Sequence, residues 1–237
     1  MIDLSIIIPS YNEYDNLKNL IIKIEKIFLS KLNIELILVN NGSTDNTKKF
    51  LEKYLEISKF NIVCLNLKKN EGYGNGILQG IRVSKGEVIA WTHADMQCDI
   101  NDVLLAYEKY CKYNNSNILV KGKRMGRSFL DYFLTLGMGF ICTIIFQTKI
   151  SDINAQPKLF SRKIVSLLSN APKDFSLDLH LLLTAKKNEF IIEEIPVYFK
   201  KRLAGISKGG GGNLLNKFKL IKRTLVYIIN TRKKWKL

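Results

Sequence analysis

Apolar and polar positions alternate along the first half of this chain in two distinct rhythms. Short apolar runs typical of buried strands occur at residues 4–9, 34–39, 61–67, 88–92 and 118–120. Between these runs, apolar residues recur with helical spacing, which predicts helices at residues 17–28, 45–57, 74–84 and 99–113. This alternation predicts an α/β domain with a doubly wound, mostly parallel sheet flanked by helices. In such sheets, ligands bind at the carboxyl ends of the strands.

The pattern changes after residue 125. Four segments of different character follow: an aliphatic and aromatic run at 129–147, a helical pattern at 175–186, a strand-like pattern at 190–198 and, after glycines 209–212, a basic amphipathic stretch at 214–237. We therefore divide the chain into three regions, residues 1–125, 126–212 and 213–237.

Composition and charge narrow the class of protein and the kinds of partner that the chain can have. The 237 residues are enough for one large domain, and 46% hydrophobic with 24% charged residues is typical of a globular protein. The formal net charge of +16 favours an anionic partner, which the charge alone leaves open as nucleic acid, a nucleotide diphosphate or acidic lipid.

The sequence also indicates a compartment. The four cysteines are irregularly spaced, without a C-x-x-C pair, which predicts no disulfide framework or zinc site and favours the cytoplasm. No basic segment precedes the first apolar run, as it would in a signal peptide. The longest apolar run, Leu134–Phe146, is shorter than the roughly 20 residues of a transmembrane helix.

Polar motifs follow four successive predicted strands. In chain order they are Ile8-Pro9-Ser10-Tyr11-Asn12-Glu13, Val39-Asn40-Asn41-Gly42-Ser43-Thr44-Asp45, Asn70-Glu71-Gly72-Tyr73-Gly74 and Trp91-Thr92-His93-Ala94-Asp95-Met96-Gln97. This ordered set resembles the family 2 glycosyltransferases of GT-A fold, especially the branch of dolichol-phosphate mannose synthases and bacterial polyprenyl-phosphate sugar transferases. The resemblance covers about residues 4–125 and continues in residues 202–208, which are similar to the R-x-x-G-x-S-K segment of that branch.

The resemblance implies a fold and a donor site. It implies a GT-A, Rossmann-like domain with the nucleotide-sugar-binding half in residues 1–125, an acceptor-side half with a mobile glycine-rich loop in residues 126–212, and a basic tail in residues 213–237. The implied substrate is a nucleotide-diphosphate sugar. The positions that match the family's donor-binding residues are Pro9, Tyr11, Glu13, Val39, Asn41, His93, Ala94, Asp95, Gln97, Arg124, Arg202 and Lys208.

The motif after the fourth strand is the expected metal site. A departing nucleoside diphosphate develops negative charge, which a divalent cation held by carboxylates stabilises. The family pattern is Asp-x-Asp with a following Gln, but here His93 stands in place of the first aspartate. The resemblance implies that Asp95, Gln97 and His93 bind Mg²⁺ or Mn²⁺, with Asp95 as a catalytic residue. Because one carboxylate is missing, we expect weaker Mg²⁺ binding.

Two further motifs differ from familiar patterns. Asn40 and Asn41 stand where the family usually has two aspartates, which leaves the nucleobase open because an amide both donates and accepts hydrogen bonds. The glycines of Gly72-x-Gly74-x-Gly76 follow the third strand, and Ile77 replaces the last glycine of a dinucleotide fingerprint. We therefore interpret them as part of the transferase loop.

The acceptor decides whether the reaction needs a base. The family inverts at the anomeric carbon, and a lipid phosphate is already an anionic nucleophile, whereas a sugar hydroxyl must lose a proton. Asp178 lies where hydroxyl-using relatives have a catalytic base, and residues 152–158 depart from the family's acceptor-side motif. We expect a polyprenyl-phosphate or lipid-linked glycan acceptor in cell-envelope glycan synthesis. The alternative is a sugar hydroxyl of a surface polysaccharide, with Asp178 as the base.

Two segments predict a membrane surface as a partner. The run at residues 129–147 suits an interfacial or acceptor-lining helix, and the tail interleaves lysines and arginines with apolar residues, as in segments that bind anionic headgroups. We therefore expect a cytoplasmic protein, peripheral at the inner face of the membrane. The sequence leaves the oligomeric state open.

Two other functions compete with this interpretation. A nucleotide-sugar-binding protein with weak catalysis would explain the acidic residues missing from two motifs. Nucleic-acid binding would explain the charge, but ordered motifs at strand ends differ from the interleaved basic and aromatic pattern of such proteins. We therefore expect no nucleic acid among the partners.

Overall fold

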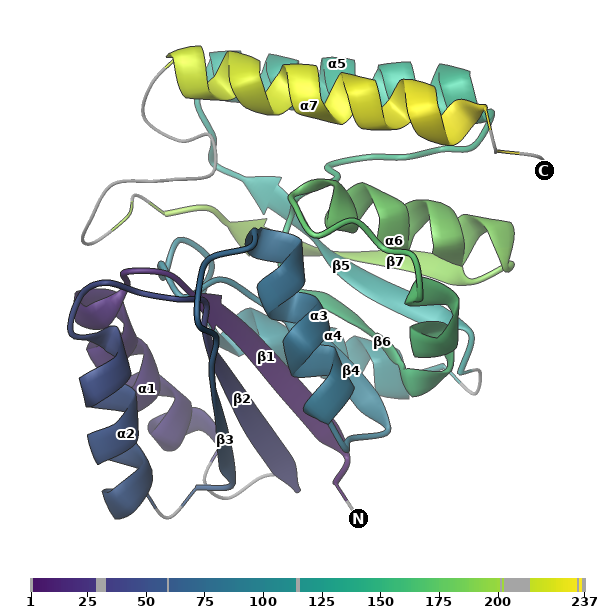
Figure 1. Cartoon of the computed structure of the whole chain (residues 1–237). Coiled ribbons are helices and arrows are strands. Elements are labelled where there is room, and N and C mark those ends of the chain that lie inside the picture. Colours follow the sequence, from purple (N-terminus) through teal and green to yellow (C-terminus); the bar gives the residue numbers. More distant parts are fainter. Residues whose placement is uncertain are drawn as a thin grey trace.

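A seven-stranded sheet forms the centre of the computed structural model, which describes residues 2–28, 33–58, 60–113, 116–200, 202, 214–233 and 235 (Figure 1). The strands are β1 (Leu4–Ser10), β2 (Ile34–Asn40), β3 (Ile62–Asn66), β4 (Val88–Trp91), β5 (Ile118–Met125), β6 (Lys158–Ser161) and β7 (Ile191–Tyr198). The helices of the described part are α1 (Tyr14–Phe28), α2 (Thr47–Ile57), α3 (Tyr73–Val83), α4 (Asn101–Cys111), α5 (Phe129–Phe146), α6 (Ser176–Lys187) and α7 (Leu214–Arg232), with a 3-10 helix at Arg162–Leu168.

The strand order is β3-β2-β1-β4-β6-β5-β7. Every pairing is parallel except those of β6, which runs antiparallel between β4 and β5. The predicted α/β class and the mostly parallel sheet are confirmed. The sequence analysis missed β6 because its four residues, Lys158–Ser161, are too short to show a period.

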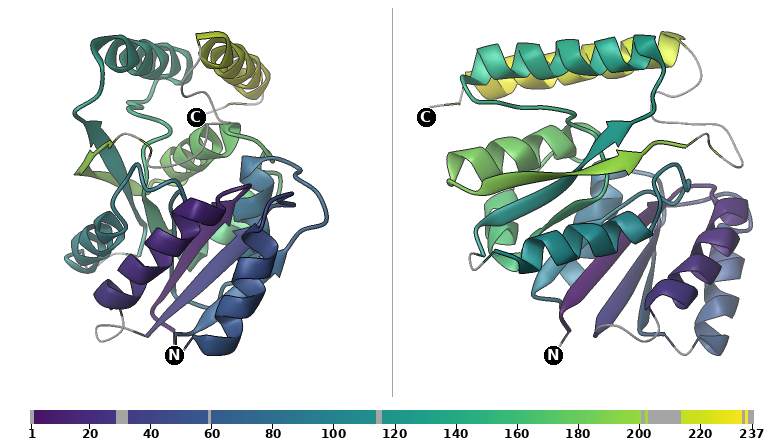
Figure 2. Two further views of the ribbon diagram at one scale, coloured as in Figure 1. Left: turned by 90° about the vertical axis from the view of Figure 1, so that its left-hand side faces the viewer. Right: turned by 180° about the vertical axis from the view of Figure 1, so that it is seen from behind.

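The two faces of the sheet are buried in separate cores, as alternation along a strand requires. Ile6 and Ile8 of β1 pack with α1 and α4, whereas Ile7 between them packs with α3 and α6. Two helical layers therefore enclose the sheet, as the edge-on view in Figure 2 shows. The carboxyl ends of β1, β2 and β4 consequently meet at one edge, where the polar motifs lie.

Helices α5 and α7 lie side by side as a further layer over α6 and the ends of β5 and β7 (Figures 1 and 2). One side of α5 is anchored, because Cys142 and Phe146 are fully buried and a Cβ on Gly139 would meet the Ile150 carbonyl oxygen at 2.9 Å. The other side exposes large apolar residues: Phe129, Leu130, Phe133, Leu136, Phe140 and Ile144, hereafter the apolar face of α5.

The length of α5 corrects one expectation. The sequence predicted an apolar segment too short to cross a membrane, but the helix spans 18 residues with mean hydropathy 1.9. By length and composition, α5 is the one helix in the described part that could cross a membrane, and 17% of it is buried. A single such helix is weak support for a membrane span.

Candidate active site

The loops after β1 and β2 are tied together by hydrogen bonds. The backbone N–H of Asn12 donates to Ser43 Oγ at 2.9 Å, and Asn12 Oδ1 accepts from the backbone N–H of Thr44 at 2.8 Å. Asn12 adopts a positive φ of 55°, a conformation that asparagine tolerates better than most residues. The predicted nucleoside-binding segments are thus held as one unit, with Pro9 paired to Val39 in the sheet.

Asn41 anchors the loop after β3 to this unit. Its Nδ2 donates to the Gly72 carbonyl oxygen at 2.9 Å and to Asn70 Oδ1 at 3.2 Å. An aspartate in this position could donate to neither, which gives a physical reason for asparagine here. Asn40 plays a similar part, since its Nδ2 donates to Asn66 Oδ1 at 2.9 Å. Both amides are therefore used to shape the loops.

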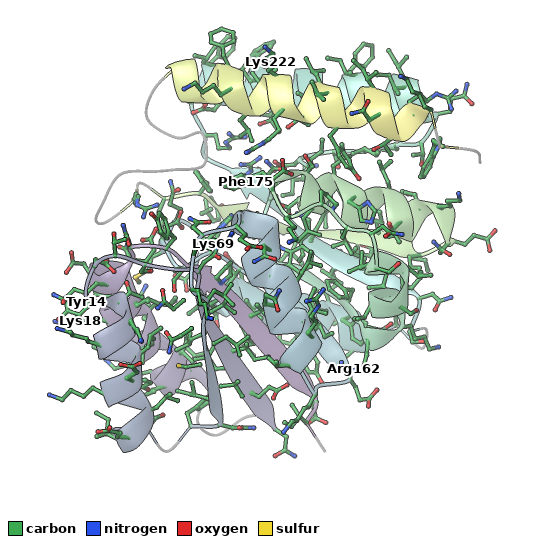
Figure 3. All side chains as sticks on the ribbon, in the orientation of Figure 1. Tyr14, Lys18, Lys69, Arg162, Phe175 and Lys222 are labelled. Atoms are coloured by element: carbon green, nitrogen blue, oxygen red, sulfur yellow. The ribbon has the colours of Figure 1, made fainter. Side chains whose placement is uncertain are left out.

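The glycines of the third motif allow the start of α3 to approach the segment before α6. A Cβ on Gly74 would meet the carbonyl oxygens of Pro172 and Asp174 at 2.6 Å, and Gly72 adopts a positive φ of 113°. This approach stacks the Tyr73 ring on Phe175, with centroids 4.5 Å apart and planes within 6°. In Figure 3, Phe175 lies near the upper end of α3.

Asp95 and Glu13 converge on one guanidinium. Arg202 Nη1 lies 3.4 Å from Asp95 Oδ2, and Nη2 contacts Glu13 Oε1. All three side chains are largely shielded from solvent, which strengthens their attraction relative to surface pairs. Three predicted donor-binding residues from distant parts of the chain therefore lie in contact.

Lys200, two positions before Arg202, is fixed to the fourth-strand motif and to Asp99 by several contacts. The backbone N–H of Lys200 donates to the Gln97 carbonyl oxygen at 2.8 Å, and Gln97 Nε2 donates back to the Lys200 carbonyl oxygen at 3.3 Å. Lys200 Nζ lies 3.1 Å from Asp99 Oδ2. These contacts explain how a residue far along the chain reaches the carboxyl end of β4.

The residues of the fourth-strand motif can bind a cation only if a substrate supplies further ligands. No cluster of three His, Cys, Asp or Glu side chains occurs among the described residues. Asp95 supplies one carboxylate, and His93 lies on the same loop with its ring 5.3 Å from that of Tyr73. Because Mg²⁺ is commonly bound through one or two carboxylates plus substrate phosphates, this donor set fits a cation that binds with a diphosphate.

Arg124, a predicted donor-binding residue near the end of β5, is paired with Asp152. Its Nε donates to Asp152 Oδ1 at 2.8 Å, and its backbone N–H donates to Oδ2 at 2.7 Å. Burial alone would raise the pKa of Asp152, but the charge and hydrogen bonds of Arg124 hold that pKa below its ordinary value. The Arg124 guanidinium also lies over the Phe199 ring, 5.6 Å from the centroid.

A cleft of about 140 Å³ opens beside this pair, between α5, α7 and the end of β5. The polar groups in its wall come from Arg124, Arg127, Asp131, Thr135, Asn154 and Thr224. The remaining wall is largely apolar, formed by Leu134, Met138, Ile153, Leu220 and Ile221. With two arginines against one aspartate, this division between polar and apolar side chains suits a ligand that carries both an anionic and an apolar group.

Asp178, the proposed base, is buried in an ion pair. Its carboxyl Oδ1 lies 3.2 Å from Lys158 Nζ and accepts from Gln156 Nε2 at 3.0 Å, while the side chain is 1% exposed. Lys158 also donates to two backbone carbonyls, and burial lowers its pKa to about 8 despite the favourable charge of Asp178. Gln156 Nε2 lies 3.0 Å from the Tyr73 hydroxyl.

Most predicted donor-site residues gather at one edge of the sheet, with two differences of environment. Val39 and Ala94 are buried, so only their backbones are available to a ligand. Lys208 lies outside the described residues. Tyr73, Gln156 and Lys158 were not predicted as site residues, although Tyr73 lies in the third motif and the other two lie in the departing segment at residues 152–158.

Comparisons with known proteins agree with this geometry. The family model for "Glycosyl transferase family 2" matches residues 5–168. The chain is 28% identical over 214 residues to a dolichyl-phosphate beta-glucosyltransferase of Dictyostelium discoideum, covering 82% of this chain and 65% of the relative. It is 27% identical over 228 residues to a protein of the same description from Trichomonas vaginalis, covering 86% and 69%. The chain thus spans about two thirds of these relatives.

Solved structures share the fold at low sequence identity. Glucosyl-3-phosphoglycerate synthase from Mycobacterium tuberculosis, in complex with Mn²⁺, UDP and glucosyl-3-phosphoglycerate, aligns with TM-score 0.70 and 15% identity over 97% of this chain and 79% of that one. The mannosyltransferase PcManGT from Pyrobaculum calidifontis, in complex with GDP-Man and Mn²⁺, aligns with TM-score 0.72 and 16% identity over 99% and 65%. These GT-A structures confirm the predicted fold.

Proposed function

This chain belongs to glycosyl transferase family 2, and on that premise we propose that it transfers a sugar from a nucleotide-diphosphate donor to a polyprenyl phosphate at a membrane surface. Donor binding is assigned to the edge where β1, β2 and β4 end, near Asp95 and Arg202. The names of the relatives from Dictyostelium and Trichomonas support a polyprenyl-phosphate acceptor.

The acceptor assignment rests on one observation, the divided cleft beneath α5 and α7. Arg124 and Arg127 offer charge and hydrogen-bond donors to a phosphate, and arginine is well suited to bidentate binding of that group. Leu134, Met138 and Leu220 offer apolar contact to the first part of a lipid chain. A soluble sugar would leave these apolar side chains without a partner.

The burial of Asp178 also supports a phosphate acceptor. A general base must come within hydrogen-bond reach of the proton that it removes. Asp178 is 1% exposed, and its Oδ1 is used by Lys158 and Gln156. A polyprenyl phosphate is already ionised near neutral pH and requires no such base. Direct attack of its oxygen at the anomeric carbon, opposite the diphosphate, inverts that centre.

A divalent cation would assist departure of the nucleoside diphosphate. Asp95, with His93 and Gln97 on the same loop, would hold it together with the diphosphate oxygens. Both structural neighbours described above are complexes with Mn²⁺, which supports this cofactor. Arg202 adds a fixed positive charge beside Asp95 that can also stabilise the leaving group.

The apolar face of α5 supports docking at the membrane surface. Because the opposite side of α5 is anchored by Cys142, Phe146 and the contact at Gly139, an orientation flat in the interface suits the helix better than a span. Lys219 and Lys222 of the adjacent α7 are exposed, and Figure 3 labels Lys222 in this layer. Their charges favour binding to anionic lipids at the inner face of the membrane. The proposed transfer at that surface would serve cell-envelope glycan synthesis.

Transfer assays test the proposal. The purified chain is supplied with UDP-glucose or GDP-mannose, with and without Mn²⁺, and offered a short polyprenyl phosphate, the matching polyprenyl alcohol or a sugar-terminated lipid. We expect product on the phosphate alone. Arg127→Ala should raise the KM for polyprenyl phosphate about 10-fold, whereas the exposed control Arg82→Ala on α3 should not. Transfer only to the sugar-terminated lipid would replace this proposal with the hydroxyl-acceptor alternative.

A further inference from the structure

A continuous series of contacts joins the buried ion pair to the fourth-strand motif. Lys158 lies 3.2 Å from Asp178, which accepts from Gln156 at 3.0 Å. Gln156 Nε2 is also 3.0 Å from the Tyr73 hydroxyl, and the Tyr73 ring is 5.3 Å from that of His93. We propose that Asp178 is a positioning residue, which acts through Gln156 and Tyr73 to hold His93 in the geometry that the donor requires.

Asp178 fixes the direction of this series. A carboxylate accepts hydrogen bonds but does not donate them, so the amide of Gln156 must turn its Nε2 toward Asp178. The same Nε2 then faces Tyr73, whose hydroxyl oxygen must accept. Burial raises the pKa of Tyr73 well above its ordinary value, so the hydroxyl keeps its proton. The Asp178 carboxylate thus sets the orientation of the Gln156 amide, and the amide in turn makes the Tyr73 hydroxyl the acceptor.

The backbone is shaped to keep Gln156 in place. A Cβ on Gly122 would meet the Gln156 carbonyl oxygen at 2.1 Å, so that only glycine lets β5 approach this segment. The backbone N–H of Gly122 donates to the Pro157 carbonyl oxygen at 2.9 Å. Tyr73 is held equally firmly, because its ring stacks on Phe175 while its hydroxyl meets Gln156.

A purely structural role explains this arrangement poorly. Replacing a buried ion pair with apolar residues of similar volume is often neutral or stabilising. Here a lysine, an aspartate and a glutamine are all fully buried, and Asp178 Oδ2 and Gln156 Oε1 lack hydrogen-bond partners. The feature that distinguishes them from a core cluster is the contact, through Tyr73, with the loop of His93 and Asp95.

The role of His93 toward a donor rests on the proposed function. The first test, however, needs no donor and is independent of that function. The chain has two histidines, His93 and His180, so imidazole resonances in an NMR spectrum of the full chain report two places separately. Tyr73→Phe, Gln156→Met and Asp178→Asn should each shift the His93 resonances at fixed pH. Asp178→Asn does so because an asparagine can donate, which lets the Gln156 amide reverse.

Tyr227→Phe is the matched control. It removes the hydroxyl 2.7 Å from His180 Nδ1, outside this series, and should shift the His180 resonances while leaving those of His93 unchanged. If Tyr73→Phe and Gln156→Met fold and leave the His93 resonances unchanged, the series does not position His93 and the inference is wrong. That result would leave the proposed function intact.

Donor binding and kinetics give the second test. With UDP and Mn²⁺ as the probe, Tyr73→Phe and Asp178→Asn should weaken binding about 10-fold, as the loss of one or two hydrogen bonds predicts. The donor KM should rise similarly, with an unchanged pH–rate profile. Loss of about 10²–10⁴-fold in kcat on Asp178→Asn, with unaltered UDP binding, would make Asp178 the base instead. Absence of UDP and GDP binding by the wild type would count against the proposed function, whereas the NMR result would still stand.

Discussion

Arg202 Nη1 lies 3.4 Å from Oδ2 of Asp95, so a residue near the C-terminal end of the chain neutralises the carboxylate expected to bind a cation. Glu13, from the loop after β1, contacts the same guanidinium. With His93 in place of the family's first aspartate, the site has lost one negative charge and holds a fixed positive one. On the proposal that Asp95 binds a cation, Arg202 and that cation would compete for Asp95 until a diphosphate bound both.

The competition predicts opposite effects of removing Arg202. Arg202→Ala should strengthen Mn²⁺ binding to the protein alone several-fold, because Asp95 loses its counter-ion, and should weaken UDP binding about 10-fold, because the diphosphate loses a charge-assisted donor. Electron paramagnetic resonance of Mn²⁺ and calorimetry with UDP measure the two effects. Weaker Mn²⁺ binding in Arg202→Ala would contradict the competition. Arg82→Ala is the control for loss of charge.

Substitutions of Asp95 and His93, both in the fourth-strand motif, test the assignment of the cation site. Asp95→Asn should abolish Mn²⁺-dependent turnover, because it removes the one carboxylate that the motif keeps. His93→Asp restores the family's acidic pair and should retain or raise turnover, with a lower Mn²⁺ requirement. The measurement is initial rate against Mn²⁺ concentration. Wild-type rates for Asp95→Asn in Mn²⁺ would show that the cation lies elsewhere.

Membrane docking should depend on both apolar area and charge. Replacing Phe129 and Phe140, which are 79% and 66% exposed, with serine should weaken liposome binding at least 10-fold. Binding of the wild type should also fall steeply with salt on anionic vesicles, because surface charges are screened over roughly 10 Å at 0.1 M. Ile57→Ser removes an equally exposed apolar residue from α2 and should have no effect. Equal wild-type binding to neutral and anionic vesicles would remove the electrostatic part of the prediction.

The contact between His180 and Tyr227 predicts a pH dependence of stability. Burial lowers the pKa of His180 below its ordinary value of 6.5, so the unfolded chain binds a proton there more readily than the folded one. Stability that depends on neutral His180 is therefore complete above about pH 6.5 and is lost as pH falls toward the lowered folded-state pKa.

Thermal or urea unfolding between pH 5 and 8 measures this effect. His180→Gln should flatten the acid side of the stability curve. Tyr227→Phe should cost about 1 kcal/mol at neutral pH through the lost hydrogen bond between α6 and α7. An unchanged acid slope in His180→Gln would assign the slope to other groups.

The sequence by itself determined the class of the fold, the edge of the sheet where the polar motifs meet and the family. An unbroken apolar run sufficed for β1 because both of its faces are buried, and helical periodicity sufficed for α1 because one side of that helix is buried. The proximity of the loops after β1, β2 and β4 could be predicted from the sequence because parallel strands present their carboxyl ends at a common edge. Glu13, Asn41 and Asp95 all lie there.

Only the tertiary structure decided what these residues contact. Arg202 meets Asp95 across 107 positions of sequence, and Gln156 meets Tyr73 across 83, separations for which no local pattern exists. In the hydroxyl-acceptor alternative Asp178 was the base, because its position matched that of a base in hydroxyl-using relatives, and the structure pairs it with Lys158 in a buried ion pair. Local sequence sets backbone preference and amphipathic periods, whereas the partner of a buried charge depends on which distant segments the packed core brings within a few ångströms.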